Sequence, residues 1–269
     1  MVKDAVCDQF RERTGERPSV DKERPDLRIR LTLQGRAASI ARDLSGAPLH
    51  ERGYRAPHRT ALNEATAAGL LLHTGWDHRA PLCDPMCGAA TFLIEAAWLA
   101  RDRAPGLGRR FSFEGWPDTD EATWRRLQDD ATARASRGTA AKLRLAGNDR
   151  HAGALALAEQ ALAAAGVADS IELRHGDCVD YVPPFATKRV LCNPPYGSRH
   201  RDDDPALAAS WQSLGQFLAA ECDGATAWVL SGNAELARHL GLRATIKMPV
   251  KNGAIDCRWL CYELGGPAA

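Results

Sequence analysis

The sequence lacks several patterns that would assign a protein class at once. None of its eight cysteines forms a C-x-x-C pair, so neither a zinc ribbon nor a dithiol redox centre is indicated. No run approaches the roughly 18 apolar residues of a membrane span, and no secretory signal opens the chain. There is no G-x-G-x-x-G dinucleotide fingerprint. We therefore expect a soluble cytoplasmic protein with buried free thiols, no membrane segment and no metal site.

The sequence also has no large excess of positive or negative charge, since the formal net charge is only +1. No overall field therefore demands a nucleic-acid partner. Residues 1–60 nevertheless carry 13 Lys/Arg against 9 Asp/Glu, a sum of +4, which leaves −3 for residues 61–269. Residues 27–33 alternate strictly and predict a half-buried strand whose outer face carries Arg28 and Arg30. These arginines are candidate RNA phosphate contacts, and a plain solvated surface is the alternative.

The chain changes character after its first fifth. The N-terminal part predicts a helix at 2–13, a strand pair at 27–33 and 37–43, and a linker at 44–60, which together bury too little for an independent domain. From residue 61 helices and strands alternate, with a polar insertion at 102–140. We therefore divide the chain into a partial α+β segment with linker at 1–52 and a second domain at 53–269.

The second domain predicts an α/β fold. Strands are expected at 80–84, 142–145, 171–174, 190–192, 226–230, 243–250 and 256–263, and helices lie between most of them. Alternation of this kind gives a mostly parallel sheet with helices on both faces, whereas K-N-G-A-I joins the last two strands as an antiparallel hairpin. A parallel sheet with an antiparallel terminal hairpin is the Rossmann-like sheet of class I S-adenosylmethionine-dependent methyltransferases. Ligands bind such sheets beyond the C-terminal strand ends.

Unusual residues follow four of the predicted strands, and we expect them to converge on one crevice. Gly88 in D-P-M-C-G lets the backbone approach a ligand beside a helix N-terminus, although many strand–helix turns look similar. Asp149 can accept hydrogen bonds from a ribose or cap the next helix. Asp177 can bind an adenine amino group or serve a turn. The candidate cofactor-binding residues are Asp84, Pro85, Met86, Cys87, Gly88, Thr91, Asn148, Asp149, Asp177 and Cys178.

The most specific signal is N-P-P-Y at residues 193–196. The lone pair of an exocyclic amino group is delocalised into its ring, so a methylating enzyme must hold both N–H bonds. The Asn193 side-chain oxygen and the Pro194 carbonyl can accept them. Pro194 and Pro195 stiffen the turn, and Tyr196 can stack on the base. A simple proline turn after a strand explains neither Asn193 nor Tyr196.

These and other segments resemble a known family. D-P-M-C-G-x-x-T-x-L-I-E-A-A, R-D-R-A-P-G-L, F-x-G-W and L-C-N-P-P-Y-G resemble the RlmL-type 23S ribosomal RNA guanine-N2 methyltransferases. So do V-K-D-A-V-x-D-Q-F, P-D-L-R-I-R and D-L-S-G-x-x-L-H-x-R-G-Y-R in the N-terminal part. The resemblance covers nearly the whole chain and implies S-adenosylmethionine as cofactor, a guanine N2 as acceptor and a THUMP-type RNA-binding module.

The resemblance also implies roles for individual residues, and this sequence departs from the family in two respects. It puts Asp84 to Gly88 near the methionine part of the cofactor, Asp149 on the ribose, Asp177 near the adenine, and Asn193 to Tyr196 at the target base. Ala90 stands where the family usually has glycine, and its methyl is expected beside the cofactor. Relative to the family, we expect only the C-terminal half of a THUMP module and no second methyltransferase domain in this sequence, which is then either a fragment or a form with a reduced RNA platform.

We therefore expect an RNA guanine-N2 methyltransferase acting on 23S ribosomal RNA. An adenine-N6 methyltransferase acting on DNA or RNA is the first alternative, because N-P-P-Y serves both amino groups. A non-catalytic RNA-binding factor is the second. Lys251 and Asn252, which we expect in the turn of the terminal hairpin, are further candidates for contact with RNA phosphate or with a flipped base, and a surface turn is the alternative for both.

Overall fold

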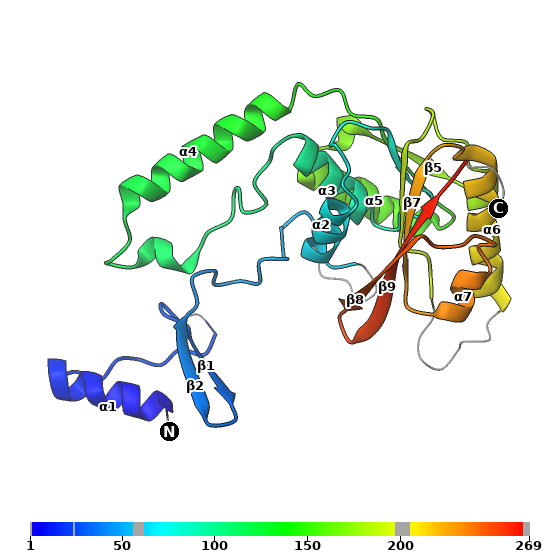
Figure 1. Cartoon of the computed structure of the whole chain (residues 1–269). Helices are drawn as coiled ribbons and strands as arrows, with labels where there is room; N and C mark the ends of the chain where they lie inside the picture. Colours follow the sequence, from blue (N-terminus) through cyan, green and yellow to red (C-terminus); the bar gives the residue numbers. More distant parts are fainter. Residues whose placement is uncertain (1, 24, 56–61, 197–204, 266–269) are drawn as a thin grey trace. The chain divides into compact units, whose positions relative to one another are not determined.

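The computed structural model describes residues 2–23, 25–55, 62–196 and 205–265. Contacts divide the chain into two compact units (Figure 1). The first unit consists of residues 1–48 and 110–121, and the second of residues 49–109 and 122–269.

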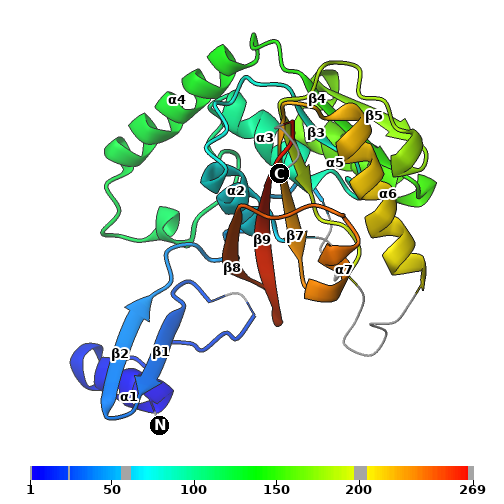
Figure 2. The same cartoon turned by 45° about the vertical axis from the view of Figure 1, so that its right-hand side comes forward.

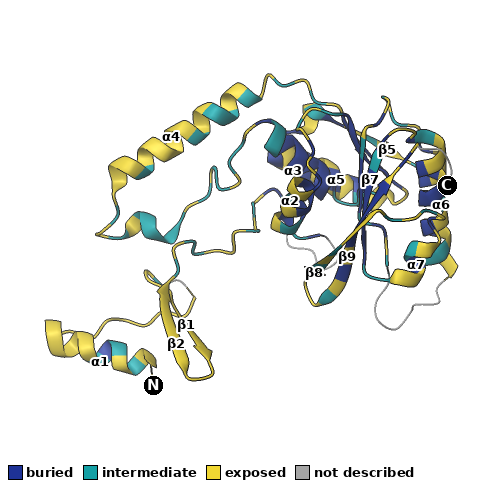
Figure 3. Ribbon diagram, viewed as in Figure 1, coloured by how far each residue is buried: buried dark blue, intermediate teal, exposed yellow. Residues whose placement is uncertain are grey.

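The first unit contains one helix and one β-hairpin. They are α1 (Val2–Thr14), β1 (Ile29–Gln34) and β2 (Ala37–Arg42), with the short 3-10 helix η1 (Ser112–Gly115). The expected half-buried strand is wrong, since every residue of β1 and β2 is exposed (Figure 3). On the apolar face, Leu31 is 39% and Leu33 69% exposed. Apolar and polar residues do alternate along β1, but no second layer of described residues covers its apolar face.

Residues 110–121 make their contacts with the first unit, although they lie far from it in sequence. The Ser112 amide donates to the Leu44 carbonyl at 3.1 Å. Arg42 forms an ion pair with Asp118 at 2.9 Å and lies 4.7 Å over the Trp116 ring. From the sequence, this segment was predicted to be part of the polar insertion at 102–140 in the second domain. The division of the chain into domains at residues 52 and 53 stays a prediction.

The second unit is built on a seven-stranded sheet with the order β5-β4-β3-β6-β7-β9-β8 (Figure 2). Its strands are β3 (Leu82–Asp84), β4 (Leu145–Asp149), β5 (Ile171–His175), β6 (Arg189–Cys192), β7 (Thr226–Ser231), β8 (Ile246–Asn252) and β9 (Ile255–Glu263). The first five are parallel, while β9 runs antiparallel to β7 and to β8. This confirms the predicted fold class. The start of β4 was predicted three residues too early.

Helices cover both faces of this sheet. The helices α2 (Glu64–His73), α3 (Thr91–Ala100) and α5 (Ala152–Ala165) lie on one face, and α6 (Pro205–Glu221) and α7 (Ala234–Arg238) lie on the other, with 3-10 helices η2 (Ala168–Ser170) and η3 (Cys178–Asp180). The long helix α4 (Glu121–Gly138) buries none of its residues and does not cover the sheet (Figure 3). The α5 helix ends at Gly166, where φ is 68°, as the sequence predicts. Among the described residues no helix is long and apolar enough to cross a membrane.

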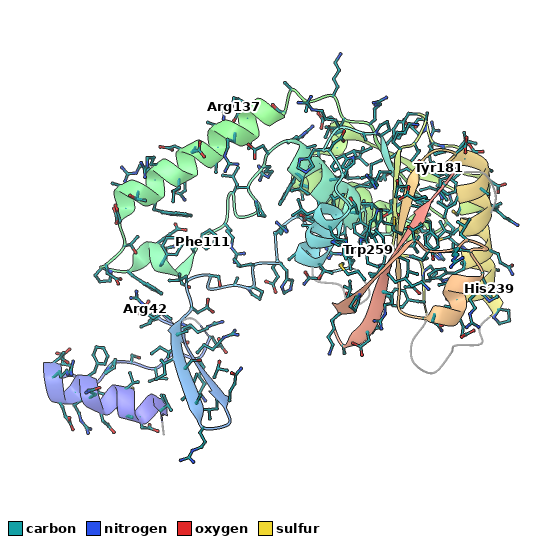
Figure 4. The ribbon with its side chains drawn as sticks, in the orientation of Figure 1. Arg42, Phe111, Arg137, Tyr181, His239 and Trp259 are labelled. Carbon is teal, nitrogen blue, oxygen red and sulfur yellow. The ribbon has the colours of Figure 1, made fainter. Side chains whose placement is uncertain are left out.

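Alternating strand residues create two cores, one on each side of the sheet. Leu191 joins the core beneath α2, α3 and α5, whereas its neighbours Val190 and Cys192 join the core beneath α6 and α7. Trp259 of β9 lies in the first core (Figure 4), where its ring stacks on those of Trp228 and Phe92 at centroid distances of 5.6 Å. Because both faces are covered, the parallel strands read as continuous apolar runs.

Buried ion pairs attach the start of the second unit to its helices. Arg52 lies 3.1 Å from the Glu95 carboxylate, and Arg55 lies 3.0 Å from that of Glu64. The Tyr54 hydroxyl donates to Glu95 at 3.0 Å. Burial raises the pKa of Glu95 to about 7, although Arg52 opposes the shift. Glu95 lies on α3, so these bonds hold the helix that follows the glycine turn.

The glycine of α6 provides a test of the packing. A Cβ at Gly215 would lie 2.5 Å from the Leu240 carbonyl oxygen and 3.0 Å from its carbon. We expect Gly215→Ala to destabilise the protein, because overpacking costs about 1–3 kcal/mol and exceeds the gain of about 1 kcal/mol in helix propensity. Gly69→Ala on α2 is the control, since a Cβ there would meet nothing within 4 Å. Urea unfolding should show Gly69→Ala unchanged or stabilised; equal losses in both would contradict the packing.

Candidate active site at the strand ends

The predicted convergence of strand ends is observed at one edge of the sheet. β3, β4, β5 and β6 are parallel neighbours, so their C-terminal ends lie side by side. The strand order reverses between β3 and β6, and ligands bind at such switch points. Cys83 of β3 pairs with Val190 of β6. The turn that begins at Asp84 therefore lies beside the turn that begins at Asn193.

The Asp149 carboxylate connects the glycine turn to β4. Its Oδ2 accepts a hydrogen bond from the Gly88 amide at 2.8 Å, and its Oδ1 accepts one from the His151 amide at 2.9 Å. The residue flanking the N-terminus of α5 is His151, which makes no side-chain cap bond. Asp149 therefore does not occupy the expected capping position, although it bonds the backbone just before the helix. Each carboxylate oxygen retains capacity for a further donor.

Asn148 connects the turns that follow β3 and β5. Its side-chain Nδ2 donates to the Pro85 carbonyl at 3.2 Å and to the Gly176 carbonyl at 3.0 Å. Its own carbonyl accepts from the Cys87 amide at 2.8 Å. Asn148 is 2% exposed. The side chain therefore fixes the two turns against each other.

The backbone at Gly88 borders open space. Its φ is 53°, and a Cβ added there would meet nothing within 4 Å. Beneath the turn, a Cβ at Gly147 would lie 2.6 Å from Leu93 Cδ1 and 3.1 Å from Cys87 Sγ, so glycine allows the turn to approach β4. Ala90 also has a positive φ, 60°, and is fully buried. Its methyl packs into the core and does not line the space beside Gly88 as expected.

The remaining candidate cofactor residues follow the same strand ends and are mostly buried. Burial raises the pKa of Asp84 well above its ordinary value, and the nearby Asp149 carboxylate adds to the shift. The Asp84 carboxylate accepts from the Met86 amide at 3.2 Å. Asp177 is half-buried and accepts from the Val179 amide at 3.3 Å. Thr91 begins α3 and is buried, as is Cys178. Burial thus favours the neutral form of Asp84, and a positively charged ligand close to it would favour the charged form.

The turn after β6 leaves two acceptors without a partner. Asn193 Oδ1 is buried and has no hydrogen-bond partner among the described residues. Within the same part of the chain, no hydrogen bond reaches the Pro194 carbonyl either. The Pro195 carbonyl, by contrast, accepts from Trp211 Nε1 of α6 at 2.8 Å. Trp211 is fully buried, so it anchors the turn and removes Pro195 from the set of free acceptors.

Tyr196 is held by one residue that follows β7 and one that ends β8. Asn252 Nδ2 donates to the Tyr196 hydroxyl at 2.8 Å. A Cβ at Gly232, just after β7, would lie 2.7 Å from Tyr196 Cδ2, so only glycine leaves room for the ring. Burial raises the pKa of Tyr196 to about 12. The phenol is therefore neutral near pH 7.

Within the second unit, the structure brings most of the sequence-predicted residues together, and Asn252 joins them through its hydrogen bond to Tyr196. Asn252 ends β8 and Lys251 pairs across the hairpin with Asp256, so neither lies in the turn itself. Arg28 and Arg30 are exposed in the first unit, and Arg28 donates to the Gly46 carbonyl at 3.4 Å. Sequence reasoning missed Trp211 and Gly232. Their contacts with the turn are long-range and leave no local signal. Within the described ranges, no cluster of three His, Cys, Asp or Glu side chains is arranged to hold a metal.

Comparisons with known proteins identify the family. Residues 52–260 match the family described as an RMKL-like methyltransferase domain, and residues 1–43 match the THUMP domain. The chain is 40% identical over 98% of its length to proteins named ribosomal RNA large subunit methyltransferase K/L from Pseudomonas paraeruginosa and Pseudomonas aeruginosa. It spans only 38% of the length of each of these relatives.

Solved structures agree in fold. SMU.472, described as a putative methyltransferase complexed with SAH, matches with a TM-score of 0.87 at 27% identity, over 99% of this chain and 70% of that one. A structure described as a predicted N6-adenine-specific DNA methylase from Listeria monocytogenes matches with a TM-score of 0.83 at 28% identity, over 99% of this chain and 68% of that one. By sequence and by fold, the chain belongs to the family of RMKL-like methyltransferase domains, preceded by a THUMP segment.

Proposed function

We propose that the protein transfers a methyl group from S-adenosylmethionine to the exocyclic N2 of a guanine in 23S ribosomal RNA. The observation that carries the proposal is the pair of unbonded acceptors, Asn193 Oδ1 and the Pro194 carbonyl, beside the open backbone of Gly88. An unpaired buried acceptor costs free energy, roughly 1–3 kcal/mol. A ligand with two N–H donors removes that cost.

The residues at the neighbouring strand ends fit S-adenosylmethionine. A Cβ at Gly88 would project into open space, so the glycine leaves room for a ligand against the turn. Burial disfavours the charged form of Asp84, and a cation close to its carboxyl would offset that effect. The cofactor's sulfonium and ammonium groups would provide such a cation. Asp149 would bind the ribose, Asp177 and Cys178 the adenine, and the 84–88 turn with Thr91 the methionine part. The cofactor supplies an activated methyl group. SAH is bound in the related SMU.472 structure.

The chain's own residues would perform the rest of the chemistry by positioning. Asn193 and Pro194 would accept the two amino hydrogens and thereby direct the nitrogen lone pair away from the ring plane. Trp211 holds the Pro195 carbonyl, so the diproline turn is preorganised before substrate arrives. Tyr196 would stack on the base. Rate enhancement then rests on orientation and electrostatics, with no covalent intermediate.

RNA as the partner is supported by the N-terminal segment. Residues 1–43 match the THUMP domain, and residues 1–60 sum to a charge of +4. Arg28 and Arg30 are exposed there, and Lys251 is exposed near the hairpin tip. Contacts of these side chains with phosphates would add affinity without base specificity. A ribosomal RNA substrate would place the protein in the cytoplasm.

The identity of the methylated base decides between guanine and adenine. The names of the relatives from Pseudomonas support ribosomal RNA, and the resemblance to guanine-N2 methyltransferases supports guanine. The name of the Listeria structure favours N6 of adenine in DNA. Both bases present an amino group to the same two acceptors, so the turn alone serves either one.

Analysis of the reaction product tests the proposal. The purified protein would be incubated with labelled S-adenosylmethionine and ribosomal RNA from cells lacking the gene, and the RNA digested for mass spectrometry. We expect N2-methylguanosine, and primer extension would map the nucleotide. Methyladenine would support the adenine alternative. Absence of transfer, together with no binding of S-adenosylmethionine in calorimetry, would indicate a non-catalytic RNA-binding factor.

A further inference from the structure

The geometry points to Asn252 as a positioning residue that fixes the Tyr196 ring for stacking on the target base. This inference rests on the proposed function and deepens it. It assigns Asn252 an action through Tyr196, in place of the direct contact with RNA that its location in a terminal hairpin suggested. The evidence is the geometry of the β8–β9 hairpin tip.

The hairpin tip extends past the C-terminal edge of the sheet. Arg258 of β9 pairs with Ser231, the last residue of β7. Ile255 precedes Arg258 by three residues, or about 10 Å at roughly 3.3 Å per residue. Asn252 pairs with Ile255, so it lies beyond the end of β7 on the side where the Asn193 turn is found. The hairpin is long enough to bring a side chain to Tyr196.

The strand alternation directs Asn252 inward. Met248 and Val250 precede it at intervals of two residues and pack against the core beneath α2, α3 and α5. Successive side chains of a strand point to opposite faces, so Asn252 continues this inner face, while Lys247 and Lys251 are exposed on the other. A single amide therefore ends an otherwise apolar row, and its Nδ2 donates to the Tyr196 hydroxyl at 2.8 Å.

The ring of Tyr196 is consequently restrained at both ends. The backbone at Gly232 contacts one edge, where a Cβ would lie 2.7 Å from Cδ2 and 2.9 Å from Cε2. Asn252 holds the hydroxyl, which also interacts with the thiol of buried Cys257. Restraining a stacking platform before the base arrives lowers the ordering cost of binding. Asn252 thus pre-orders the surface against which the base would lie.

A double-mutant cycle tests this action through Tyr196. We expect Asn252→Ala to lower kcat/KM for RNA about tenfold, which corresponds to about 1.4 kcal/mol and lies within the usual range for one hydrogen bond. The Kd for SAH should stay unchanged. In a Tyr196→Phe background the same substitution should have no further effect, because the hydroxyl is gone. An effect of full size in that background would overturn the inference and indicate direct contact with RNA.

Two controls separate this result from other causes. Lys247→Ala changes an exposed side chain on the same strand and should keep wild-type kinetics. Fluorine NMR with 3-fluorotyrosine gives a readout independent of activity, since the chain has only four tyrosines and Tyr196→Phe assigns the resonance. Asn252→Ala should shift or broaden only that signal. An unchanged signal would overturn the inference alone, whereas an inactive wild-type protein would overturn the proposed function.

Discussion

Replacing Asn193 with alanine is expected to lower kcat for methyl transfer by about a hundred- to a thousandfold, the usual loss when one preorganised polar group at the reacting centre is removed. The physical reason is that Asn193 Oδ1 is a buried acceptor without a partner among the described residues. Its removal leaves one amino hydrogen of the base unbound. Single-turnover rates with labelled S-adenosylmethionine measure the effect. The Kd for SAH, measured by calorimetry, should remain near the wild-type value.

The variant Asn193→Asp provides the matched comparison. It keeps an acceptor oxygen in the same place, while it replaces the amide donor with a second oxygen and adds a negative charge. Because the acceptor remains, it should retain more activity than Asn193→Ala. Gln160→Ala, an exposed amide on α5, should behave as wild type. Normal turnover in Asn193→Ala would refute the assignment of this residue. Equal losses in the alanine and aspartate variants would show that acceptance of a hydrogen bond is not its role.

Replacing Asp149 with alanine is expected to weaken cofactor binding about a hundredfold. The carboxylate accepts from the amides of Gly88 and His151 at 2.8 and 2.9 Å, and it is the proposed partner of the ribose hydroxyls. A hydrogen bond to a charged group contributes about 1.5–3 kcal/mol, and about 1.4 kcal/mol corresponds to a tenfold change in Kd. Losing one such bond and loosening the glycine turn therefore accounts for the expected effect. Calorimetry with SAH measures it.

Two further variants define what Asp149 contributes. Asp149→Asn keeps one oxygen, so it should bind SAH with intermediate affinity. Glu159→Ala removes an exposed carboxylate from α5 and should bind normally. A wild-type Kd in Asp149→Ala would mean that the cofactor lies elsewhere along the edge, and the assignment of the strand ends would need revision.

The sequence predicts a candidate site because the pattern that marks it is local. In α/β folds the residues that bind ligands directly follow a strand, so Gly88, Asp149 and Asn193 could be recognised next to apolar runs. The antiparallel terminal hairpin followed from an Asn-Gly pair between alternating segments. Gly166 ended its helix as predicted, because only glycine adopts a positive φ without cost. In each of these cases a short segment carries its own signal.

The supports of the site came only from the tertiary structure. Trp211 reaches Pro195 from a helix, Asn252 reaches Tyr196 from the last hairpin, and Gly232 makes room for that ring. The predicted burial of β1 was likewise wrong, since all of its residues are exposed. Alternating apolar and polar residues indicate which face of a strand is apolar, but they do not indicate whether another element covers that face. Periodicity and turn chemistry act between residues a few positions apart. Hydrogen bonds between residues 16 or 56 positions apart depend on how the sheet and its helices pack, which the order of residues along the chain does not display.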